Sequence, residues 1–182
     1  MEVDFNQYVN SNTLGLNNLY IYMEKLVNFL QKKQNITSLT LSNCYIDAQC
    51  GEVLNEALEN INLPNITECK LTSSIIGAEG SIAITKLLKN GNFPNLVKLD
   101  LISNDIDVEG GIILMNALRD GSFSNIKELN LLYDNVCNEG ITALRESWNN
   151  NMLPNLIKFS FPFSITNDNK DIEMSSQYLF GE

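Results

Sequence analysis

Carboxylates and thiols are the side chains of this sequence whose types could support chemistry. Glu79, Glu109 and Glu139 recur at a constant interval, and carboxylates alone could serve as acids or bases. The chain has no histidine, however, and it lacks the GxSxG and phosphate-binding-loop motifs of known enzyme classes. A place at the start of a helix, where a carboxylate meets the positive end of the helix dipole, explains the three glutamates without catalysis. We therefore expect the protein not to be an enzyme.

The four cysteines are expected to be buried thiols and not metal ligands or disulfides. Cys69 falls at an apolar position of the repeat described below, Cys44 falls at a turn, and Cys50 and Cys137 fall where the chain enters a helix. There is no CxxC pair, and the acidic residues are dispersed along the chain. We expect neither a metal site nor a cofactor.

A repeated unit positions these side chains, and it starts at equal intervals from Asn35, Asn65, Asn95, Asn125 and Asn155. Its fifth and seventh positions are apolar and its sixth is mostly polar, which predicts a short strand in each unit. Leu114, Ala117 and Leu118 then have helical spacing, so each unit also contains a helix. A single unit cannot bury its own apolar face, so the units must stack. The fifth positions are Leu39, Cys69, Leu99, Leu129 and Phe159, and the seventh are Leu41, Leu71, Leu101, Leu131 and Phe161.

Local signals also mark where these helices begin and end. Asp47 and Asp107 occupy the expected N-cap positions, where a side-chain oxygen can accept hydrogen bonds from the first helical N–H groups. Gly91 and Gly121 are suited to the helix stops.

The segment from Leu96 to Asn104 reads LxxLxLxxN, and a helix opening on Glu109 and Gly110 follows. This pattern resembles the ribonuclease-inhibitor type of leucine-rich repeat, and the resemblance covers residues 35–161. It implies an α/β solenoid, a right-handed α/β superhelix with short parallel strands on the concave face and helices on the convex face. The sequence departs from the family in a slightly longer unit and in the turn position, where Ser74 departs from the usual Asn or Cys.

The two ends of the chain differ from the middle. Residues 17–33 are predicted to form one amphipathic helix, because Leu19, Met23, Leu26, Val27 and Leu30 follow helical spacing. At the other end, Tyr178 to Phe180 either fold back over the last strand or belong to a mobile tail. One structural domain is expected, divided into an N-terminal capping helix region (1–34), leucine-rich repeats (35–64, 65–94, 95–124, 125–154 and a partial 155–161) and a C-terminal cap or tail (162–182).

Binding residues are expected on the concave face. The fourth positions, which are Ser38, Glu68, Lys98, Glu128 and Lys158, alternate in charge and predict a cross-strand ladder. Toward the C-terminus the eighth and ninth positions become apolar, as at the centre of a protein interface. The alternative is that Tyr178 to Phe180 cover these residues. The candidate protein-binding residues are Asp100, Ile102, Glu128, Leu132, Tyr133 and Phe163.

Composition narrows the partners. The chain has 182 residues and a formal charge of −10, which disfavours nucleic acid. It has no apolar run long enough to cross a membrane and begins without a secretory signal, so we expect a cytoplasmic protein that does not bind membranes. We expect a monomer, or a weak dimer formed through an exposed edge of the last strand.

Three functions are compatible with the sequence. The family resemblance implies a scaffold that binds another protein on its concave face. A second reading is a small-GTPase regulator resembling a Ran GTPase-activating protein. A third is a bacterial effector delivered into a host cell, because the chain is rich in asparagine and its end, with Leu179 and Phe180, resembles a type IV secretion signal.

Overall fold

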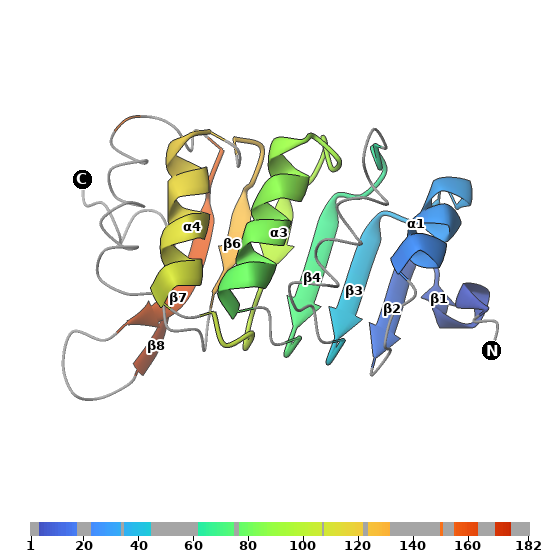
Figure 1. The fold of residues 1–182 in the computed structure, drawn as a ribbon, viewed down its shortest axis with the longest axis horizontal. Helices are drawn as coiled ribbons and strands as arrows, with labels where there is room; N and C mark the ends of the chain where they lie inside the picture. Colours follow the sequence, from blue (N-terminus) through green and yellow to red (C-terminus); the bar gives the residue numbers. More distant parts are fainter. Residues whose placement is uncertain are drawn as a thin grey trace.

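The protein forms an open, mostly parallel β-sheet with helices packed on one side (Figure 1). The computed structural model describes residues 4–17, 23–33, 35–44, 62–74, 77–106, 108–121, 124–131, 150, 155–163 and 170–175. The sheet has eight strands whose spatial order follows the chain, β1 to β8, and it is not closed into a barrel. The α/β class and the parallel pairing predicted from the sequence are confirmed.

The strands are β1 (Val9–Asn10), β2 (Thr13–Asn17), β3 (Ser38–Ser42), β4 (Glu68–Thr72), β5 (Lys98–Asp100), β6 (Glu128–Asn130), β7 (Lys158–Phe163) and β8 (Lys170–Ser175). The helices are a 3-10 helix at Phe5–Tyr8, α1 (Met23–Lys32), α3 (Gly77–Lys89) and α4 (Val108–Arg119). β2 to β7 are parallel to one another, whereas β1 and β8 run antiparallel to their neighbours.

Equivalent positions of successive units pair in register across the sheet. The fifth-position residues face one another from β3 to β7, as in Cys69 opposite Leu99 and Leu99 opposite Leu129. These side chains are buried in one continuous core, together with the seventh-position leucines. Because a one-residue shift would turn every buried side chain to solvent, this apolar alternation fixes the register.

Helices α3 and α4 lie side by side and cover the same side of the sheet as α1 (Figure 1). Glu79 and Glu109 lie in their first turns, as predicted. Both helices stop before a glycine with positive φ, +71° at Gly91 and +84° at Gly121, a conformation that side chains with a Cβ rarely adopt. The helix signals predicted at Asp47, Asp107 and Glu139 lie outside the described residues.

The N-terminal region departs from the prediction of one helix over residues 17–33. Asn17 ends strand β2, and helix α1 spans Met23–Lys32. Leu14 and Leu16 are fully buried and pair with Leu39 and Leu41, so β2 is a further strand of the same parallel series. The step along the chain from Leu14 to Leu39 is shorter than the step from Leu39 to Cys69, so β2 does not follow the constant spacing of the later units.

The C-terminal region adds a strand where we expected a cap or tail. β8 pairs antiparallel with β7 along its whole length, from Lys158 opposite Ser175 to Phe163 opposite Lys170. The edge of the last parallel strand, which we expected to be open for weak dimerisation, is therefore occupied by β8. Tyr178 to Phe180 lie outside the described residues.

Buried polar side chains link each unit to the one before it at the turn after the strand. Asn104, which is fully buried, accepts a hydrogen bond from the Ser74 N–H (2.7 Å) and donates to the carbonyls of Leu71 and Leu101. Ser74 repeats this role one unit earlier, because its Oγ accepts from the Cys44 N–H (3.3 Å) and donates to the Leu41 carbonyl (3.4 Å). The turn at Ser74, where the sequence departs from the family pattern, is thus hydrogen-bonded by the same plan with a shorter side chain.

The asparagines that begin the units at Asn95, Asn125 and Asn155 make a second, exposed series of links. The Nδ2 groups of Asn95, Asn125 and Asn155 donate to the carbonyls of Pro64, Pro94 and Ser124, each at 2.9 to 3.0 Å. Each bond joins residues 31 positions apart and so ties one unit to the end of the preceding unit.

Within the described part of the chain, no helix is both long enough and apolar enough to cross a membrane.

Candidate functional site

The sheet face turned away from the helices carries the predicted ladder of charges. Lys98 lies between two carboxylates, with its Nζ 3.4 Å from Oε1 of Glu68 on β4 and 3.3 Å from Oε2 of Glu128 on β6. Glu68 also accepts a hydrogen bond from Ser38 (3.0 Å) and forms an ion pair with Lys70 (3.2 Å). The ladder predicted from Ser38 through Glu128 is therefore confirmed.

The ladder shifts the ionisation of its members. Burial raises the pKa of Glu68, but the hydrogen bonds from Ser38, Lys70 and Lys98 outweigh this and leave the pKa below its ordinary value of 4.5. The pKa of Lys98 is raised, first by the hydrogen bond to Glu128. Since these groups are partly exposed, each pair contributes only about 0.2–1 kcal/mol to stability, and the main effect is to hold the charges in fixed places.

Asp100 is the half-buried carboxylate at the centre of this face. It ends strand β5 and lies opposite Lys70 on β4 and Asn130 on β6. Its Oδ1 accepts a hydrogen bond from the Ile102 N–H (3.2 Å). Burial raises the pKa of Asp100 above its ordinary value of 3.8, against the opposing effects of the Ile102 hydrogen bond and the nearby lysines.

The ion pairs described on this face do not include Asp100. Lys70 directs its ammonium to Glu68 on its own strand, and Lys98 directs its ammonium to Glu68 and Glu128. Among the residues that the structure describes, no lysine or arginine nitrogen lies within 4.0 Å of the Asp100 carboxylate. The sequence predicts Asp100 as a candidate binding residue but does not predict that Lys70 lies beside it.

The character of the face changes at Ile102. On β3 and β4 the eighth position is hydroxylic, and the side chains of Ser42 and Thr72 share a hydrogen bond of 2.8 Å. In the third unit the equivalent residue is Ile102, which is half-buried, and the Asp100 hydrogen bond holds its backbone in a turn immediately after β5. At this position of the unit, the side chain thus changes from a hydroxyl-bearing residue on β3 and β4 to an apolar residue at Ile102. A role of this change in binding stays a prediction.

The remaining candidate residues are placed as follows. Glu128 begins β6 and is held by Lys98, which is two residues before Asp100 on the neighbouring strand. Phe163 ends β7, opposite Lys170 of β8, and the position of its side chain is not described. Leu132 and Tyr133 lie outside the described residues. The structure thus joins Asp100 to Ile102 by a hydrogen bond and places Glu128 on the neighbouring strand, paired with Lys98. The apolar half of the predicted interface stays a prediction.

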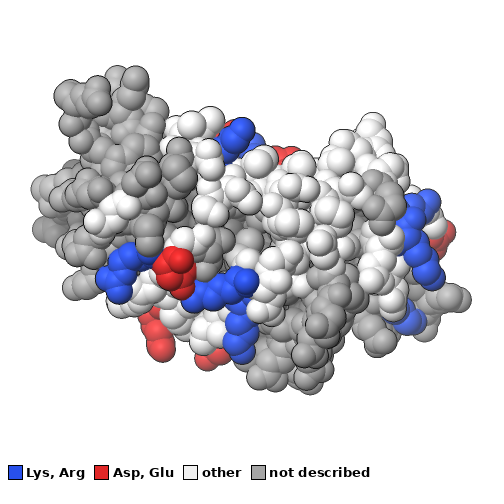
Figure 2. All heavy atoms as spheres, turned by 90° about the horizontal axis from the view of Figure 1, so that it is seen from above, with Lys and Arg blue, Asp and Glu red and all other residues white. Residues whose placement is uncertain are grey.

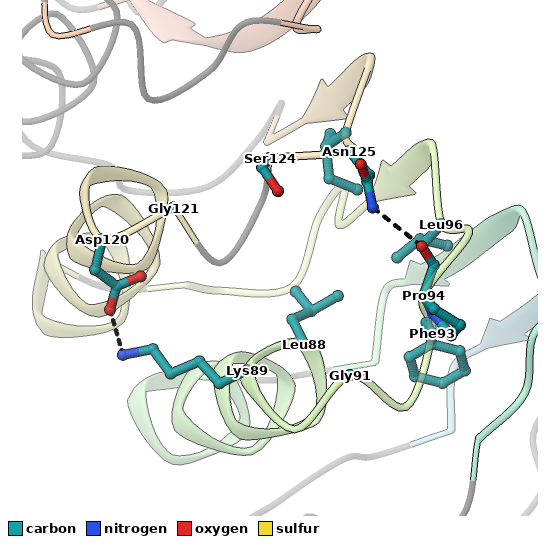
Figure 3. Close-up of a pocket in the computed structure, with 11 residues that line it drawn as sticks. Leu88, Lys89, Gly91, Phe93, Pro94, Leu96, Asp120, Gly121, Ser124 and Asn125 are labelled. Atoms are coloured by element: carbon teal, nitrogen blue, oxygen red, sulfur yellow. Dashed lines mark hydrogen bonds and ion pairs between the residues drawn. The ribbon is translucent and has the colours of Figure 1, made fainter.

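A separate hollow of about 370 Å³ lies at the ends of α3 and α4 (Figure 3). Its walls include Leu88, Phe93 and Leu96, and the ion pair between Lys89 and Asp120 (2.5 Å) joins the two helices beside it. No motif in the sequence marks this hollow, which arises from the packing of two helix ends against two turns.

The charges around this end of the molecule are arranged in small groups. Figure 2, which looks down on the end that is uppermost in Figure 1, shows Lys and Arg in separate clusters with Asp and Glu beside some of them. Lys32, Lys86, Lys89 and Arg119 all lie in the last turns of their helices, where cations offset the negative end of the helix dipole. Their position therefore has a structural cause.

Within the described ranges, no group of three or more His, Cys, Asp or Glu side chains could hold a metal ion. The whole chain matches no protein-family model, and no curated protein matches it.

Proposed function

We propose that this chain is a leucine-rich-repeat solenoid of the ribonuclease-inhibitor type that acts as a non-catalytic scaffold and binds a partner protein on its open sheet face. Three features support the solenoid: strands that follow chain order, equivalent positions that pair in equal steps from β3 to β7, and polar links that recur between units. A solenoid of this kind presents an extended surface formed by its strands.

The observation that carries the binding function is the arrangement of charged side chains on the open face. Glu68, Lys98 and Glu128 are fixed by one another across three strands, and Asp100 and Ile102 lie beside them, all partly accessible. Groups that are already held in place lose little conformational freedom when a partner binds, which favours specific recognition. A mixed rim of charges around an apolar centre is typical of protein interfaces.

The test compares a charge reversal on the open face with the same reversal on the helix side. Partners are captured from a lysate, identified by mass spectrometry, purified and titrated calorimetrically. We expect Lys70→Glu to change the affinity of the purified partner by about tenfold or more, because it replaces a positive charge by a negative one beside Glu68 and Asp100 on the binding face.

Lys86→Glu, the same reversal at an exposed position of helix α3, is the matched control and should change the affinity by less than about threefold. Melting temperatures of both variants establish that each is folded. A partner whose affinity changes equally with both variants, or only with Lys86→Glu, contradicts binding on the sheet face. The double substitution of Tyr133 and Phe163 by alanine tests the apolar half of the predicted interface in the same assay.

A further inference from the structure

Asp100 differs from the other described carboxylates of the open face in how its charge is compensated. Glu68 contacts Lys70 and Lys98, and Glu128 contacts Lys98, each within 3.4 Å. Asp100 is more deeply buried than Glu68, yet its described polar contact is a single backbone N–H, that of Ile102. Lys70 and Lys98 act on the Asp100 charge without being in direct contact with it. A carboxylate removed from water without a cation in direct contact is costly, so this position favours a ligand that supplies positive charge.

The surroundings of Asp100 restrict what that ligand can be. Asp100 Oδ1 is engaged by the Ile102 N–H, so Oδ2 is the oxygen best placed to accept from a guest. Ile102 adds a half-buried apolar surface next to it, suited to the methylene stem of a long side chain. The whole chain carries a net charge of −10, which attracts basic partners.

Resting on the proposed function, we infer that Asp100 is the receptor for an arginine or lysine side chain of the partner protein, whose charged end binds the Asp100 carboxylate while its stem packs on Ile102. Lys70 and Lys98 are engaged by Glu68 and Glu128, which leaves the approach to Asp100 to a group from outside.

The experiment uses peptides selected from a randomised displayed library against the full chain. Peptides whose affinity changes for Lys70→Glu, which lies opposite Asp100, but not for Lys86→Glu are taken as ligands of the open face. Each arginine of the best peptide is then replaced by citrulline, which has a similar shape without the charge, and each lysine by acetyl-lysine. Affinities are measured for the wild type, for Asp100→Asn and for Glu128→Gln.

We expect one neutral replacement to weaken binding to the wild type by about tenfold and to change binding to Asp100→Asn by less than about twofold, because the charge it pairs with is already missing. The same replacement should weaken binding to Glu128→Gln about as much as to the wild type. Asparagine at position 100 can still accept from the Ile102 N–H, so the fold is retained, and Asp100→Ser provides a second uncharged variant.

Two results overturn the inference and are distinguishable from failure of the proposed function. The role of Asp100 is overturned if the face-binding peptides contain no essential basic residue. It is also overturned if replacement of the basic residue weakens binding equally in the wild type and in Asp100→Asn. Either result leaves the scaffold function intact. If no selected peptide is sensitive to Lys70→Glu while some are sensitive to Lys86→Glu, the binding face itself is wrong.

Discussion

Replacement of Asn104 by alanine should be among the most destabilising single substitutions in the chain. The side chain is completely buried, and it satisfies the Ser74 N–H and the carbonyls of Leu71 and Leu101. Alanine would leave these three backbone groups without that partner, and each buried group left unsatisfied costs about 1–3 kcal/mol. Allowing for some relaxation and entry of water, we expect a loss of about 3–5 kcal/mol in the free energy of unfolding.

Urea denaturation, followed by circular dichroism and by the fluorescence of the single tryptophan, measures this loss. Asn95→Ala is the matched control, because it makes the same substitution in the same unit. Asn95 is exposed and donates one hydrogen bond, to the Pro64 carbonyl, which water can replace. Its loss should cost less than about 1 kcal/mol.

The comparison between the two asparagines tests whether the buried hydrogen bonds hold the units together. A cost for Asn104→Ala no greater than that for Asn95→Ala would refute the reasoning, because it would mean that the buried links do not hold the units together. A change in the urea m-value would indicate instead that one end of the array unfolds separately from the other.

The remaining predictions concern individual positions. Ser73 has a φ of 51°, so Ser73→Val should cost about 1–2 kcal/mol in urea denaturation, whereas Ser73→Gly should cost little or nothing. Because burial raises the pKa of Asp100, the wild type loses stability as the pH rises through the folded-state pKa and the carboxyl group ionises. Thermal melts should therefore show Asp100→Asn gaining stability relative to the wild type between about pH 3 and about pH 7. Glu68→Gln should show the opposite, because the lowered pKa of Glu68 gives stability that is present above the unfolded-state pKa and lost as the pH falls through the folded-state value. Burial raises the pKa of the Cys69 thiol to about 12, so peptide mapping after iodoacetamide treatment at about pH 8 should find Cys69 unmodified in the folded protein and alkylated in urea; rapid alkylation without urea would contradict the buried position.

The sequence predicts the central strands well because the residues that recur at constant spacing are also the residues that are buried. Because Leu99 and Leu101 alternate with Asp100, a strand that turns Asp100 outward is the one arrangement that buries both leucines. The same alternation in each neighbouring unit requires the same strand orientation. Leu14 and Leu16 have this alternation too, but they occur once and out of step with the later units, and the amphipathic segment that follows them draws the prediction toward a helix. β8 is harder still, because the alternation of Ile172 and Met174 in KDIEMS is short and belongs to no repeat, and its place is set by backbone pairing with β7.

The candidate site is less predictable because it depends on which of several partners a long side chain chooses. Lys70 could contact Glu68 on its own strand or Asp100 on the next, and composition cannot distinguish these. In the structure Lys70 contacts Glu68, and this choice makes Asp100 the exception among the described carboxylates of the face. The hollow beside Lys89 and Asp120 likewise depends on how two helix ends pack, which no local motif records.

Pairing in equal steps also constrains how the length of this chain can change. Excision of residues 65–94 would bring β5 against β3 with Leu99 facing Leu39, and Asn104 would replace Ser74 as the side chain that meets the turn at Cys44. Duplication of the same segment would add one more strand in the same sense. An insertion or deletion that is not a whole number of units would leave paired residues without equivalent partners on the next strand. Gain or loss of whole units is therefore the length change that this architecture tolerates best.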